Sequence, residues 1–193
     1  MTETEWLECA AVHPMLHFLR YEAPAGPGRC RKYRLFACAS AQRATSGDID
    51  REAIAVAERW ADRQVDAVEL QVARNCGVRG LARKTLLRFA RMAATDIAYA
   101  QDNDPLLPAL LRDVMGNPFR PSQFAASWRT SDVMALASRF YKDRAFDRLP
   151  QLIVALEDAG CEDERILAHC RMDSPHIRGC WVVDLVLGLA GAS

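Results

Sequence analysis

The sequence predicts an all-α fold, a single-domain irregular helical bundle of about seven to nine helices. Prolines and glycines divide the chain into segments of helical length, and most segments repeat apolar residues at intervals of three and four. The best candidate for a strand, RCRKYRLFAC at 29–38, alternates poorly and continues into alanines. Because 50% of the 193 residues are hydrophobic, the chain can bury one substantial core, and we expect a single domain over 1–193.

The N-terminal half should contain a series of amphipathic helices. One covers 29–46, the next begins at Asp48, a residue that can cap free amides, and a third covers 66–76 before Gly77. A fourth, over 81–100, separates an apolar face from a basic one. The apolar face carries Leu86, Ala90, Ala93 and Ile97, and the basic face carries Lys84, Arg88 and Arg91.

A proline-rich connector at 102–124 should follow, with one short helix from about Pro108 to Met115. Its leucines and phenylalanines give it enough apolar surface to pack against the rest of the domain. The C-terminal part predicts a helix over 131–144 capped by Ser131, a short helix begun by Pro150, and a closing pair over 163–171 and 176–188.

The charge balance discourages nucleic acid as a partner, because 25 basic and 25 acidic residues give a net charge of zero. The charges are nevertheless segregated, with basic stretches at 29–34 and 74–91 and acidic stretches at 48–69 and 157–164. Weak nucleic-acid binding through the 74–91 stripe is therefore a third possible function, although solvated faces or internal pairs explain the stripe better. The GVRG turn at 77–80 suggests a KH-type loop, but that domain needs a sheet.

The N-terminus and the hydropathy pattern predict a cytoplasmic protein without a membrane partner. MTETEWLECA lacks a basic region followed by an apolar run, and the longest apolar stretch, 181–189, is interrupted by Asp184. The odd number of cysteines, seven at unrelated spacings, indicates reduced thiols.

Several short sequence segments resemble those of an uncharacterised protein family from planctomycetes and other bacteria with large genomes. They are EWLEC, RLFACA, GNPFRP, DRAFDRLPQLIVALEDAGC, ILAHCR and PHIRGCWVVDLVLG, and the resemblance extends from about Glu5 to Gly188. It implies a helical domain of unknown activity, with no reaction or ligand to transfer. Family members commonly read ACACCRR where this chain has ACASAQR, so Ser40 and Ala41 cannot supply thiolate ligands here.

The densest group of reactive side chains lies near the C-terminus, where Cys161, His169, Cys170, His176 and Cys180 occur within twenty residues. Imidazole and thiolate are ligands that zinc prefers, and a helix–turn–helix could bring His169, Cys170, His176 and Cys180 together. The spacing matches no paired zinc framework, and buried cysteines are usually core residues. We therefore expect core packing without a cofactor, and a zinc site is the alternative interpretation.

Asp184 lies in a helix that is otherwise almost entirely apolar. A carboxylate is costly to bury without a partner, so we expect a buried ion pair with an arginine. The candidate partners are Arg34, Arg120 and Arg144.

The NPFRP segment presents Phe119 and Arg120 between two prolines, which leaves the loop little conformational entropy to lose on binding. Aromatic and arginine side chains often anchor interfaces. In the alternative interpretation, Phe119 fills the core and Arg120 pairs with an acid such as Asp147.

We therefore expect a non-enzymatic helical protein-interaction module whose partner is another protein, because no phosphate loop, nucleophile–base pair or complete metal framework is visible. The NPFRP loop and the face with Lys84, Arg88 and Arg91 are the candidate interaction surfaces. The alternative is a metal- or thiol-dependent enzyme or sensor that uses the C-terminal His/Cys group.

Overall fold

The computed structural model describes residues 1–24, 28–44, 48–75, 93–96, 98 and 104–189. Within these ranges the regular structure consists of helices and no strand, so the all-α prediction is confirmed. None of the described helices is long and apolar enough to span a membrane.

The N-terminal half is organised around one long helix, α3 (Arg29–Ala44), which packs against α4 (Asp48–Ala61) and α8 (Leu107–Met115). Before it come α1 (Glu3–Glu8) and α2 (Val12–Tyr21), and after α4 comes α5 (Ala67–Asn75). The start of α1 is fixed by a capping box in which the amide of Glu5 donates to Thr2 and the amide of Thr2 donates to the Glu5 carboxylate. The expected helix over 81–100 lies outside the described residues except for 93–96 and 98, which are helical.

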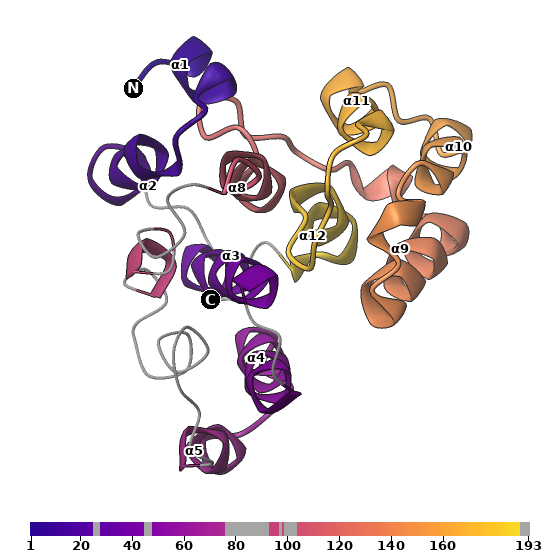
Figure 1. Ribbon diagram of the computed structural model, residues 1–193. Helices are drawn as coiled ribbons and strands as arrows, with labels where there is room; N and C mark the ends of the chain where they lie inside the picture. The colour runs from indigo at the N-terminus through magenta and orange to yellow at the C-terminus, as the bar shows by residue number, and fades with distance from the viewer. Residues whose placement is uncertain (25–27, 45–47, 76–92, 97, 99–103, 190–193) are drawn as a thin grey trace.

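The C-terminal half consists of α9 (Ser131–Asp143), α10 (Gln151–Asp158), α11 (Glu164–Arg171) and α12 (Trp181–Leu187), joined to α8 through the 3-10 turn Ala126–Trp128. A second 3-10 turn, Phe146–Arg148, links α9 to α10. The cap of α9 is Thr130 and not Ser131, because the Thr130 hydroxyl accepts the amide hydrogen of Val133. Figure 1 shows these four helices together on one side, with α12 beside α8.

The buried apolar side chains form two clusters, one for each half. The N-terminal cluster contains Trp6, Phe36 and Leu111, and the C-terminal cluster contains Phe140, Ile166 and Val183. Helices α8 and α12 touch where the two clusters meet. Polar and ionisable side chains are concentrated at this junction, as described below.

The prediction of a helix over 176–188 was wrong at its beginning, since α12 starts at Trp181. Gly179 has φ of +97°, which a right-handed helix cannot accommodate. In addition, the amide of Ile177 donates to the Asp113 side chain and not to a backbone carbonyl of the same helix. Residues 176–180 instead form a loop, which we call the 176–180 loop.

Gly179 should be among the least replaceable of the glycines that the structure describes. A Cβ atom there would lie 2.9 Å from Cδ1 of Leu35, in addition to the unfavourable φ. Gly160 shares a positive φ of 79° but has no atom within 4 Å of such a Cβ. We expect Gly179→Ala to cost about 1–3 kcal/mol more unfolding free energy than Gly160→Ala, because only it overpacks the core. Urea denaturation of both variants measures this difference, and equal costs would contradict the close packing against Leu35.

Candidate metal centre

Four side chains with metal-binding atoms meet at the junction between the two halves. They are Asp113 from α8, His169 from α11, and His176 and Cys180 from the 176–180 loop, and their ligand atoms all lie within 4.8 Å of one another. The site is closed to solvent, because the side chains of Asp113, His169 and His176 are 1%, 10% and 4% exposed and Cys180 is fully buried.

Asp113 is at the centre of this group. Its Oδ1 lies 2.7 Å from Nδ1 of His176 and 3.1 Å from Nε2 of His169, and its Oδ2 accepts the amide hydrogen of Ile177 at 2.9 Å. Burial alone would raise the pKa of Asp113, but the two histidine contacts outweigh it and the net shift is downward. Asp113 is therefore held as a carboxylate in a place from which water is excluded.

Cys180 completes the group, with its Sγ 3.2 Å from Nε2 of His169. Burial, and after it the charge of Asp113, raises the pKa of this thiol well above its usual range. A cation bound among these groups would instead lower the pKa of Cys180, because a thiol that coordinates a metal ion is deprotonated. The local electrostatics of the site therefore depend on whether a positive ion is bound.

Packing fixes the histidine rings in place. Asp163 caps α11 by accepting the amide hydrogen of Arg165, and this sets the start of the helix that carries His169. The His169 ring then contacts the rings of His176 and Trp181, with centroids 4.8 and 5.0 Å apart. The ligand atoms thus converge through the backbone and through ring packing, as a pre-formed site requires.

The structure brings together three of the four residues that the sequence suggested as ligands, namely His169, His176 and Cys180. Cys170 is not in the group, because consecutive helix residues point about 100° apart and its neighbour His169 faces the site. Cys170 is packed in the C-terminal cluster, where burial raises its pKa to about 12.

Sequence reasoning missed Asp113. It is 56 residues from His169 in the chain, so no local spacing connects the two. One signal was present: Asp113 stands beside Leu110, Leu111 and Val114 in a helix that buries those residues, and the cost of an unpaired buried carboxylate predicts a partner there, as it did for Asp184.

The arrangement does not supply a cysteine–histidine–aspartate relay for nucleophilic catalysis. Such a relay needs the thiol at one imidazole nitrogen and the carboxylate at the other. Here Cys180 and Asp113 both contact Nε2 of His169, and the thiol is fully buried. His169 is therefore not placed between the thiol and the carboxylate.

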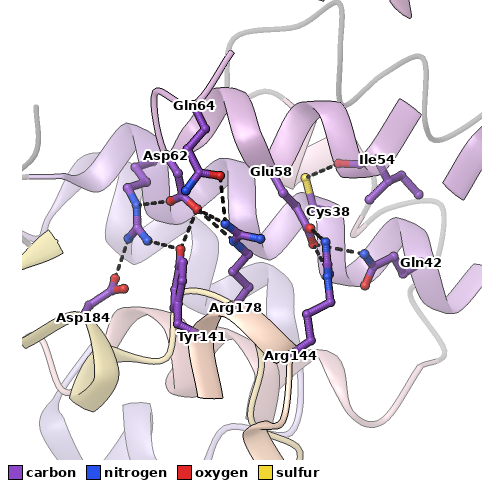
Figure 2. A network of polar contacts seen from close by, with 11 residues as sticks. Cys38, Gln42, Ile54, Glu58, Asp62, Gln64, Tyr141, Arg144, Arg178 and Asp184 are labelled. Carbon is purple, nitrogen blue, oxygen red and sulfur yellow. Dashed lines mark hydrogen bonds and ion pairs between the residues drawn. The ribbon is translucent and has the colours of Figure 1, made fainter. Parts of the chain in front are cut away.

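A second polar cluster contains Asp184 (Figure 2). Asp184 is paired with Arg31, whose Nη1 lies 2.6 Å from Oδ2 of the carboxylate, and both side chains are almost fully buried. Two of the expected partners were wrong, because Arg120 pairs with Glu3 and Arg144 pairs with Glu58. Arg31 lies in α3, three residues before the third candidate, Arg34.

The NPFRP loop packs against the N-terminal helices. Phe119 stacks on Phe18 with ring centroids 5.0 Å apart, and it remains 36% exposed. Arg120 pairs with Glu3 at 2.9 Å and not with Asp147, and Asn117 donates to the same carboxylate at 2.7 Å. The role of the NPFRP loop in a protein interface stays a prediction.

The basic stretch at 29–34 is explained in part by internal pairing. Arg29 donates to the carbonyl oxygens of Leu19 and Ala23 at 2.9 and 3.3 Å, and Arg31 is buried. The other interaction candidates, Lys84, Arg88 and Arg91, lie outside the described residues.

No family model, curated protein or solved structure matches this chain. The resemblance to the bacterial family and the role as a protein-interaction module therefore stay predictions.

Proposed function

We propose that the protein binds one zinc ion through Asp113, His169, His176 and Cys180. The observation that carries this proposal is the convergence of four ligand-type atoms, from helices and a loop far apart in the sequence, within 4.8 Å. Each of these side chains would be costly to bury alone, so their convergence at one buried point supports a shared ligand.

The spacing of the four atoms suits a tetrahedral ion. Around zinc, with bonds of about 2.0–2.3 Å, ligand atoms lie about 3.3–3.8 Å apart. The separations here are 2.7, 3.1 and 3.2 Å for three pairs and at most 4.8 Å overall, so they bracket that range.

The donor set favours zinc over other common ions. Calcium and magnesium take oxygen ligands almost exclusively, whereas thiolate and imidazole suit zinc and the later transition metals. Four protein ligands leave no coordination position for water or substrate, which is typical of structural zinc sites. The Asp113 carboxylate and the Cys180 thiolate would together balance the charge of Zn²⁺.

The position of the site suggests what the ion does. Asp113 belongs to α8, which packs in the N-terminal cluster, whereas the other three ligands belong to the C-terminal half. An ion bound by all four would therefore cross-link the two hydrophobic clusters. We infer a structural role, in which metal binding stabilises the junction of the helical bundle.

Metal analysis of protein purified without a histidine tag tests the proposal. We expect about one equivalent of zinc per chain in the native protein, and loss of zinc in Cys180→Ser. Cys170→Ser is the matched control, because Cys170 is equally buried and adjacent to a ligand but lies outside the group, and it should keep its zinc. Less than about a tenth of an equivalent in zinc-supplemented native protein, or unchanged zinc in Cys180→Ser, would refute the proposal.

A further inference from the structure

The 176–180 loop carries two of the four candidate ligands, yet it has no regular secondary structure. Its geometry must therefore come from contacts on either side. On the side of α8, the amide of Ile177 donates to Asp113, and within the loop the amide of Cys180 donates to the carbonyl of Ile177 at 2.9 Å. Gly179 lies against Leu35 of α3.

Arg178 connects the loop to the N-terminal half through an ion pair with Asp62. Its Nε and Nη2 lie 2.8 and 2.6 Å from Oδ2 of Asp62, and Nη2 also donates to Gln64 at 3.3 Å (Figure 2). Its guanidinium group lies 4.6 Å from the centre of the Tyr141 ring. The Arg178 side chain is 11% exposed, so this ion pair is shielded from water.

Asp62, in turn, is a fixed anchor. It follows α4 in the N-terminal half, its side chain is 3% exposed, and it accepts hydrogen bonds from Arg31 at 2.8 Å and from the Tyr141 hydroxyl at 2.7 Å. Arg31 also donates to Tyr141, which closes the network. An arginine bound to such an anchor has little freedom to move, and neither has the backbone that carries it.

We propose that Arg178 is a positioning residue for the metal centre, and that its pairing with Asp62 holds His176 and Cys180 at ligand spacing before the ion binds. Arg178 is two residues from each of these ligands, so fixing it fixes the loop between them. Without the pair, metal binding would have to order the loop and lose its conformational entropy. The inference rests on the proposed zinc site.

Cobalt(II) and zinc titrations of the full chain test this role, with cobalt reporting the site through its d–d bands and its thiolate-to-cobalt charge-transfer band. We expect Arg178→Ala to weaken metal affinity by about 10- to 100-fold, as is typical when an outer partner of a metal ligand is lost. Arg178→Lys keeps the charge and should recover part of that loss. Asp62→Asn should weaken affinity in the same direction.

Arg144→Ala is the matched control. Arg144 also joins the C-terminal half to the region of α4, through its ion pair with Glu58, but it has no metal ligand near it in the chain (Figure 2). We expect its metal affinity and cobalt spectrum to equal those of the native protein. Circular dichroism confirms folding, and if Arg178→Ala does not fold, Arg178→Lys and Asp62→Asn carry the test.

The outcomes separate the two proposals. A native protein that binds neither metal refutes the zinc site itself. Native binding with unchanged affinity in Arg178→Ala overturns only the positioning role, and so does an equal loss in Arg144→Ala, which would indicate general destabilisation. Weaker binding and an altered charge-transfer band in the Arg178 variants alone support it.

Discussion

Replacing Arg31 with methionine should lower the free energy of unfolding by about 3–5 kcal/mol, in the range measured for broken buried ion pairs. Arg31 is the cation that pairs with both Asp62 and Asp184, and burial raises the pKa of Asp184 despite this pairing. Asp62 would keep Arg178 and Tyr141, but Asp184 would remain as a buried carboxylate without its arginine.

The partner variants sharpen this expectation. Asp184→Asn should cost less, about 1–3 kcal/mol, because Arg31 keeps its contact with Asp62. The double variant Arg31→Met/Asp184→Leu should be more stable than Arg31→Met alone, because it removes the buried carboxylate that has lost its arginine. Urea denaturation of the three variants measures these differences. A change below about 0.5 kcal/mol for Arg31→Met, the size of an ordinary surface substitution, would show that the network does not stabilise the junction.

Zinc should raise the thermal stability of the native protein by a large and specific amount. Free zinc at 1,000 times the dissociation constant stabilises the folded state by about 4 kcal/mol. For a chain of this size, that free energy corresponds to about 8–16 °C in Tm. Calorimetry with zinc and with a chelator measures the difference.

Asp113→Asn should remove most of this zinc-dependent increment, because the variant lacks the carboxylate that links α8 to the other ligands. Asp184→Asn is a matched control, being a buried carboxylate outside the ligand group, and should keep the increment. An equal increment in both variants would mean that zinc acts elsewhere.

Local sequence patterns predicted the helices well where a cap or a periodic stripe marked them. An example is the short helix of the connector, expected from Pro108 to Met115 and found as Leu107–Met115. The pattern failed at 176–180, where His176, Cys180 and Asp184 at intervals of four mimic a helix. The conformation there is set by Gly179 and by the tertiary contact of Ile177 with Asp113, and hydrophobic periodicity reports neither of them.

The candidate site also combines residues that local sequence marks with residues that only tertiary contacts bring together. Its C-terminal members could be found from residue type alone, because histidine and cysteine are concentrated there. Asp113 and the pairing of Arg31 with Asp184 depend on contacts across 56 to 153 residues, which no single-sequence spacing records. Burial energetics could identify which carboxylates need a partner, but the tertiary fold decides which partner they have.

X-ray absorption spectroscopy at the zinc edge of the metal-loaded native protein tests the central claim most directly. One sulfur at about 2.3 Å and three nitrogen or oxygen ligands at about 2.0–2.2 Å is the expected shell, with no sulfur in Cys180→Ser. A shell of two or more sulfurs would place zinc at other cysteines, and a shell without sulfur would exclude Cys180. Either result would contradict a site built from Asp113, His169, His176 and Cys180.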